Sequence, residues 1–204
     1  MRFSGSASAG FDGNLDAYKL SGTEGTPQIS SETAEGLRLS INSLPGGDKD
    51  VRIPLHFEMN SNAEVHFKVT GLESFHKAIP VYLEDRQLKT LINLRSQPEY
   101  SFSHNPDNSP DRFSLLFAGS YGQAATENQP EARLLTAGEL HYLEIPSMLN
   151  KEVTLSINDA LGRQISVSRE INTGIIQLKT PASRGVYFIR VQSGTSGWTG
   201  KFIY

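Results

Sequence analysis

The stretch from Val153 to Tyr204 decides the fold, and it reads VTLSINDALGRQISVSREINTGIIQLKTPASRGVYFIRVQSGTSGWTGKFIY. It opens with apolar residues that alternate with Thr, Ser and Asn, which indicates a half-buried strand. The segment after this strand must reverse the chain. Asp159 can accept hydrogen bonds from backbone N–H groups ahead of it, and Gly162 can adopt positive φ without strain. The first third of the stretch therefore predicts a β-hairpin.

A return strand follows the turn, with apolar residues at Ile165 and Val167. Pairing residue 157 with 165 and residue 155 with 167 would place every apolar side chain of the hairpin on one face. In this register Arg163 points outward. A generic hairpin of an antiparallel sandwich would give the same pattern, so the hairpin alone does not identify a function.

Two further segments complete the stretch. Gly185 opens a strand in which Tyr187, Ile189 and Val191 face inward, and Lys201–Tyr204 forms a short terminal strand. The order of the three segments resembles the C-terminal sorting domain of proteins exported by the type IX secretion system of Bacteroidetes. The residues that carry the resemblance are those of the DxxGR turn, the GxY strand and the terminal strand: Asp159, Gly162, Arg163, Gly185, Tyr187 and Lys201.

This resemblance covers about residues 139–204 and implies a small immunoglobulin-like sorting module. It also implies export through the periplasm and outer membrane, and a secreted or cell-surface protein. The partners that it implies are the outer-membrane translocon, a surface sortase that cuts before the module, and an anionic lipopolysaccharide that the upstream part is joined to. Sorting domains of this family often open with a PNP segment, which residues 134–144 lack.

From Gly36 onward the chain reads as short strands separated by turns every 8–12 residues, which is typical of a β-sandwich or jelly roll. Part of this region resembles β-sandwich modules that precede the sorting domain in large Bacteroidetes surface proteins. The resemblance rests on four segments: Pro80–Asp85, Thr90–Leu94, Tyr100–Phe102 and Asp111–Leu115. We expect Tyr82 and Phe102 to be buried and Asp85 to initiate a turn.

The segment 118–138 is rich in Ala, Gly, Gln, Glu and Thr and lacks strand periodicity. The predicted organisation is therefore all-β with two β-sandwich domains. A jelly-roll-like module spans 1–120, a linker spans 121–138, and the immunoglobulin-like sorting domain spans 139–204. Leu134 and Leu135 could begin a strand inside the predicted linker.

The composition narrows the classes of function. A net charge of −3 argues against non-specific nucleic-acid binding. No apolar run approaches the roughly 20 residues of a membrane-spanning helix. Cysteine is absent, which excludes disulfides and thiolate metal sites. The residues after Met1 do not form the apolar core of a signal peptide, so we expect the chain to be part of a longer exported protein.

The sequence gives no support for catalysis or for a cofactor. It contains no nucleophile elbow, zinc-protease motif, Walker loop or dinucleotide fingerprint. Glu84 and Asp85 are adjacent and point to opposite faces of a strand, so they cannot form a glycosidase pair on their own. We therefore expect a protein that is not an enzyme.

His56 and His66 are the one weak candidate for metal binding. A hairpin centred on Ser61, with residue 57 opposite 65 and residue 55 opposite 67, would place the two imidazoles side by side on the outer face. Glu58 and Glu64 would lie one pair closer to the turn. The alternative is a solvated cross-strand histidine pair, because a second shell of supporting groups is not evident.

The rival function is a carbohydrate-binding or adhesive module with no sorting role. Such modules usually present exposed aromatic side chains in a row or shallow groove. The candidates here are Trp198, Tyr121 and Tyr142, which are far apart in sequence. A purely structural spacer is a third possibility.

Overall fold

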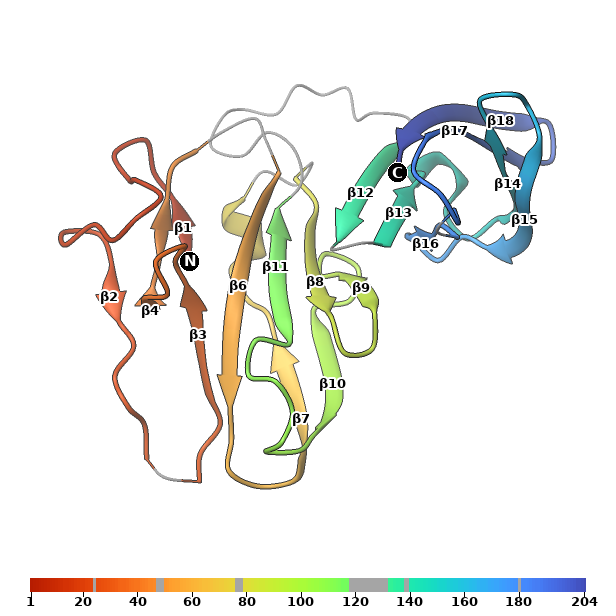
Figure 1. The fold of residues 1–204 in the computed structure, drawn as a ribbon. Helices are drawn as coiled ribbons and strands as arrows, with labels where there is room; N and C mark the ends of the chain where they lie inside the picture. The colour runs from red at the N-terminus through yellow and green to blue at the C-terminus, as the bar shows by residue number, and fades with distance from the viewer. Residues whose placement is uncertain (24, 47–49, 76–78, 118–131, 138–139, 180) are drawn as a thin grey trace. The chain divides into compact units, whose positions relative to one another are not determined.

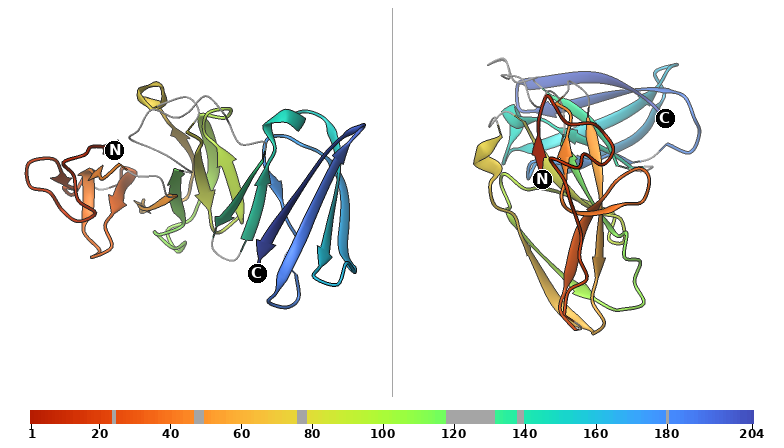
Figure 2. Two further views of the ribbon diagram at one scale, coloured as in Figure 1. Left: turned by 90° about the horizontal axis from the view of Figure 1, so that it is seen from above. Right: turned by 90° about the vertical axis from the view of Figure 1, so that its left-hand side faces the viewer.

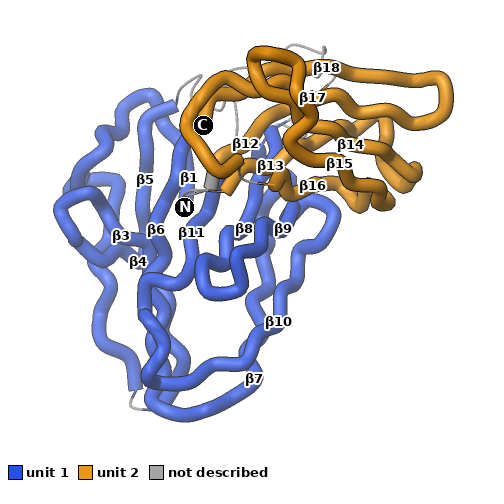
Figure 3. Tube along the Cα trace, turned by 45° about the vertical axis from the view of Figure 1, so that its right-hand side comes forward, with its two compact units in different colours: residues 1–127 blue, residues 128–204 orange. Residues whose placement is uncertain are grey.

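The computed structural model describes residues 1–23, 25–46, 50–75, 79–117, 132–137, 140–179 and 181–204. The protein is all-β, as predicted, and nearly all of its strand pairs are antiparallel (Figure 1). Helical structure in these residues is confined to two 3₁₀ turns, Leu72–Ser74 and Pro146–Met148. The chain divides into an N-terminal unit of residues 1–127 and a C-terminal unit of residues 128–204 (Figure 3).

The N-terminal unit is built on a seven-stranded antiparallel sheet in the order β2-β4-β3-β6-β11-β8-β9. A separate antiparallel pair, β7 and β10, lies against one face of this sheet (Figures 1 and 2). The shortest pair, β1 and β5, is parallel. The bounds are β1 (Arg2–Phe3), β2 (Ala17–Tyr18), β3 (Gln28–Glu32), β4 (Arg38–Ile41), β5 (Ser43–Leu44), β6 (Val51–Glu58), β7 (Ala63–Lys68), β8 (Val81–Asp85), β9 (Thr90–Asn93), β10 (Glu99–His104) and β11 (Phe113–Phe117).

The core of the N-terminal unit lies between these two layers. Successive side chains of a strand point to opposite faces of the sheet. On β6, Leu55 and Phe57 therefore point into the core, and the polar residues point to the other face. The pair β7–β10 contributes Val65 and Phe102 from the opposite side. Aromatic rings meet edge to face across the gap, with the Phe57 and Phe102 centroids 5.6 Å apart. The jelly-roll-like connectivity expected for this unit stays a prediction.

A buried ion pair closes one end of this core. The Asp85 carboxylate accepts hydrogen bonds from Arg112 Nε at 2.8 Å and from the Tyr100 hydroxyl at 2.7 Å. It also accepts bonds from the N–H groups of residues 87 and 88, so Asp85 organises the turn that the sequence predicted. Burial alone would raise the pKa of Asp85, but the bonds from Arg112, Tyr100 and Leu88 outweigh it and lower the pKa. Tyr82 and Phe102 are buried, as predicted.

The C-terminal unit consists of two antiparallel sheets, β15-β14-β17-β18 and β12-β13-β16. Its core joins apolar residues of both sheets, among them Leu155 and Ile189 from the first and Leu143 and Ile176 from the second. The immunoglobulin-like connectivity stays a prediction. The bounds are β12 (Arg133–Ala137), β13 (Leu140–Glu144), β14 (Glu152–Asp159), β15 (Gln164–Ile171), β16 (Ile176–Gln177), β17 (Val186–Ser193) and β18 (Ser196–Ile203).

The predicted linker 121–138 lies outside the described residues except for 132–137. Within that part, β12 pairs along its whole length with β13, so the sheet begins before the predicted domain start at residue 139. Leu135 is buried, whereas Thr136 beside it is exposed. Leu134 and Leu135 are adjacent, and two adjacent apolar residues are too few to show the alternation by which a strand is predicted.

Candidate functional site

The turn between β14 and β15 is held together by the Asp159 side chain. Its Oδ1 accepts hydrogen bonds from the N–H groups of Leu161 and Arg163, both at 2.9 Å, and its Oδ2 accepts one from Arg163 Nε at 2.7 Å. Desolvation alone would raise the pKa of Asp159, but the bonds from Arg163 and Leu161 lower it. Gly162 adopts a φ of 79°, which a glycine takes without strain. Arg163 remains largely exposed, as the sequence predicted.

The second motif segment begins β17 and is fastened to the end of the chain. Gly185 and Tyr204 exchange two backbone hydrogen bonds, with N–O distances of 2.8 and 3.0 Å. Tyr187 is buried, and its hydroxyl donates to the Ser183 carbonyl at 2.6 Å. Its ring lies 5.5 Å, between centroids, from that of the buried Phe202. The third segment therefore completes the packing of the second.

Strand registry brings the three motif segments together. Asp159 on β14 lies opposite Tyr187 on β17, which lies opposite Phe202 on β18. In the next row Phe188 lies opposite Lys201, which is exposed. Segments that are far apart in sequence thus meet at one end of the four-stranded sheet (Figure 2). The terminal strand is also longer than predicted, since β18 begins at Ser196 rather than Lys201.

The predicted hairpin exists, but its predicted register is wrong by one residue. Ile157 lies opposite Ser166 and Ser156 lies opposite Val167, with a bulge between Ile157 and Asn158. A shift of one residue moves every side chain of a strand to the other face. Ile165 and Val167 therefore point away from the core and are about half exposed.

This shift gives the four-stranded sheet an apolar outer face. The face is the side opposite the core, and its polar members include Lys201 and Arg190. Exposed apolar patches mark interaction surfaces when they are contiguous and rimmed by polar residues. The exposed apolar residues on its strands are Ile165, Val167, Ile171, Val186, Phe188 and Ile203.

The predicted pairing of His56 with His66 is wrong. β6 pairs with β3 and β11, whereas β7 pairs with β10 in the other layer. His66 lies opposite Ser101, whose hydroxyl is 2.7 Å from its Nδ1, and His56 lies opposite Ser30. The two histidines are therefore on strands that are not neighbours, and the metal site that required both of them fails.

The aromatic residues weighed for carbohydrate binding do not form an exposed row in the described part of the chain. Tyr142 is buried at 3% exposure, and Tyr121 lies outside the described residues. Trp198 is partly buried and packs against the core of the C-terminal unit. Its ring lies against Gly200, where a Cβ would be only 2.1 Å from Cη2, so the glycine makes room for the indole.

Comparison with known families gives a match for the region in which the motifs meet. Residues 141–204 match the family described as a secretion system C-terminal sorting domain. These residues form a C-terminal sorting domain of the type IX secretion system. The protein is accordingly exported, and is secreted or displayed on the cell surface. A search of curated proteins found no match. The described residues include no helix long and apolar enough to cross a membrane.

Proposed function

We propose that the outer-membrane translocon binds the C-terminal unit at the end of the four-stranded sheet where the three motif segments meet. A surface sortase then cuts the chain before this unit and joins the upstream part to an anionic lipopolysaccharide of a Bacteroidetes cell. The observation that carries the proposal is the alignment of Asp159, Tyr187 and Phe202 across three neighbouring strands.

The chemistry of the surrounding surface supports this assignment. Phe188 and Ile203 expose apolar side chains on the outer face. Lys201 lies directly opposite Phe188 and two residues before Ile203 on the same strand, so it borders both. Arg163 extends from the turn at the same end of the sheet, because Asp159 fixes its guanidinium. β18 is also an edge strand of the sheet, so a row of its backbone groups faces outward. An apolar patch with basic residues beside it suits a partner with an apolar, acidic surface.

The test is surface display of the chain, exported with a signal peptide in a type IX-competent host. Phe188→Ser and Ile203→Ser should retain the chain in the periplasm, because they remove exposed apolar contacts without opening the core. Leu88→Ser, at an exposed apolar residue of the N-terminal unit, is the matched control and should be displayed normally. If both the Phe188→Ser variant and the Ile203→Ser variant are displayed normally, the outer face is rejected as the recognition surface.

We also propose that the N-terminal unit is a non-catalytic stalk that binds a protein partner as an added strand. Ile29 faces the same side as Phe57 but is 46% exposed, because β3 extends beyond the covering pair β7–β10. The resulting groove has a volume of about 620 Å³ and is lined by apolar side chains such as Val65. In the described residues β7 pairs only with β10, so its other edge can accept a strand.

A library of extended peptides with alternating apolar residues tests this second proposal against the full chain. Binding should be lost in Ile29→Arg, which places a charge in the groove, and retained in Leu88→Arg. Binding on a glycan array, without peptide binding, would instead favour the carbohydrate-binding alternative.

A further inference from the structure

His56 occupies an unusual position in the N-terminal unit. It lies on β6 between Leu55 and Phe57, so its side chain points to the face opposite the hydrophobic core, yet it is only 5% exposed. Buried imidazoles require polar partners for both ring nitrogens. Nδ1 lies 2.9 Å from Asp111 Oδ1, and Nε2 lies 3.4 Å from Glu58 Oε2.

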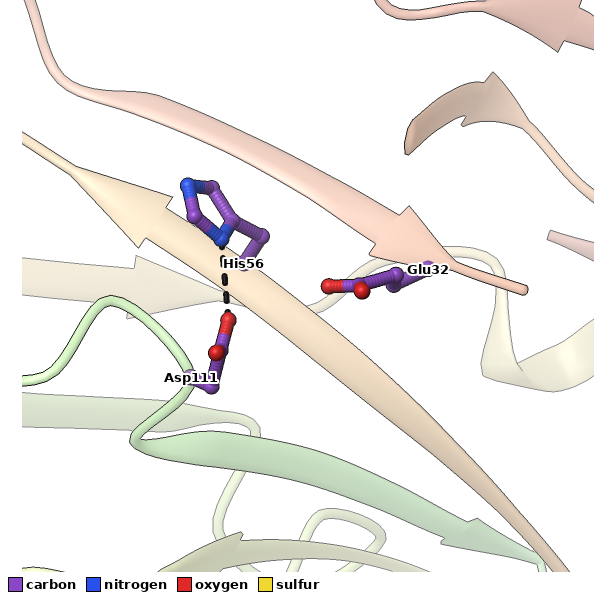
Figure 4. Close-up of side chains that lie close together, drawn as sticks. All are labelled: Glu32, His56 and Asp111. Atoms are coloured by element: carbon purple, nitrogen blue, oxygen red, sulfur yellow. Dashed lines mark hydrogen bonds and ion pairs between the residues drawn. The ribbon is translucent and has the colours of Figure 1, made fainter. Parts of the chain in front are cut away.

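A third carboxylate completes the group. The ligand atoms of Glu32, His56 and Asp111 all lie within 4.8 Å of one another. Glu32 ends β3, and Asp111 stands just before β11, so the two strands that flank β6 each bring one carboxylate. Figure 4 shows that both carboxylates lie on the same side of the imidazole.

The charges of this cluster are not balanced by basic side chains. In the described part of the chain, neither Glu32 nor Asp111 forms an ion pair with a lysine or arginine. The nearby Arg38 is paired with Glu58, at 3.8 Å, and Arg86 donates to the Asp111 backbone carbonyl rather than to its carboxylate. Two carboxylates and one imidazole thus converge around a space where a divalent cation would neutralise them.

We propose that Glu32, His56 and Asp111 bind one Zn²⁺ ion. Zinc accepts imidazole nitrogen together with carboxylate oxygen, whereas Ca²⁺ requires six to eight oxygen ligands that this cluster does not supply. His56 binds the ion through Nδ1 as the neutral imidazole, with its one ring proton on Nε2. Nε2–H then donates to Glu58, which fixes the tautomer and the orientation of the ring.

The ion would act as a clip across three elements. It joins the end of β3, the middle of β6 and the segment that leads into β11, which are distant in sequence and adjacent in the sheet. Sites of this kind couple metal binding to folding, because the ligands come together only in the folded state. The chain has no cysteine, so a zinc clip would supply a cross-link that a disulfide cannot.

The test uses the full chain, stripped with a chelator and then titrated calorimetrically with Zn²⁺, Mn²⁺ or Ca²⁺. We expect one Zn²⁺ per chain and a melting temperature that rises with zinc concentration. Asp111→Asn and Glu32→Gln should weaken zinc binding by at least about 10-fold, since both keep the size of the side chain and remove its charge.

Two matched controls separate this site from adventitious binding. Asp107→Asn removes an exposed carboxylate from the same loop, and His66→Gln removes a histidine from the other layer; neither should change zinc affinity. Failure of the full chain to bind Zn²⁺ with a dissociation constant below about 100 µM overturns the proposal. Equal zinc affinity in the Asp111→Asn, Glu32→Gln and unaltered chains overturns it as well. Neither result bears on export.

Discussion

Deleting residues 201–204 should unfold the C-terminal unit rather than merely remove a recognition sequence. The deletion takes away Phe202, which is 3% exposed and packs against Tyr187. It also removes the two backbone hydrogen bonds between Gly185 and Tyr204 and the last rungs of the β17–β18 ladder.

The expected cost follows from these contacts. Truncating a buried phenylalanine costs about 3–5 kcal/mol, and each lost hydrogen bond costs about 1 kcal/mol net. The sum is roughly 5–9 kcal/mol when several backbone bonds are included. A unit of this size has a total stability of only about 4–12 kcal/mol, at roughly 0.05–0.15 kcal/mol per residue. The deletion therefore removes most or all of the stability.

The single tryptophan makes the measurement selective. Trp198 lies in β18 and packs against the core of the C-terminal unit, so its fluorescence in urea reports on that unit alone. The full chain should show a cooperative transition, whereas the deletion variant should emit as an unfolded chain already in buffer. Lys201→Ala is the control and should stay within about 0.5 kcal/mol of the unaltered chain. A cooperative transition with an unchanged midpoint in the deletion variant would refute this reasoning.

Three more predictions concern the turn and the buried ion pair. Arg112→Met should lower the free energy of unfolding in denaturant by about 3–5 kcal/mol, because it leaves the buried Asp85 carboxylate without its charge partner. Adding Asp85→Asn should recover part of that stability. An Arg112→Met variant as stable as the unaltered chain would contradict this. Gly162→Val should cost about 1–2 kcal/mol from backbone strain alone, since a Cβ meets nothing within 4 Å, whereas Gly162→Asn should be nearly neutral by the same assay. Because the folded pKa of Asp85 lies below its usual value of 3.8, the stability that its charge contributes is present above that pH and is lost as the pH falls further. The melting temperature should therefore fall less in Asp85→Asn than in the unaltered chain when the pH is lowered below about 4.

The individual strands could be predicted from the sequence because alternation of apolar and polar residues is a local property. The alternation predicts strands at 51–59, 64–69 and 113–117. The last has the bounds of β11, β6 ends one residue earlier than predicted, and β7 begins and ends one residue earlier. Strand partners could not be predicted in the same way. A short loop after β6 allows a hairpin, but the chain instead crosses to the other layer, where β7 pairs with a strand more than 30 residues further on.

The motif residues of the candidate site were found from sequence, but their spatial relation was not. Asp159 and Gly162 form the predicted turn, whereas the bulge beside Asn158 reverses the faces of β15 and exposes Ile165. The first half of β18 was not predicted because Trp198 is its one large apolar residue among Ser, Gly and Thr, and a single residue gives no apolar periodicity. His56 and the two carboxylates of Glu32 and Asp111 come from three separate segments, and nothing in their spacing signals that they meet.

The position of β18 in the sheet has a consequence for biosynthesis. β18 is the last strand of the unit to leave the ribosome, and within the described residues it pairs only with β17. Domains fold as units once their segments have emerged. A chain whose translation stops before residue 196 therefore lacks an edge of the sheet and the partner of Tyr187. Such a chain cannot form the row of Asp159, Tyr187 and Phe202 that joins the three motif segments, so the sorting domain is complete only when its last strand is present.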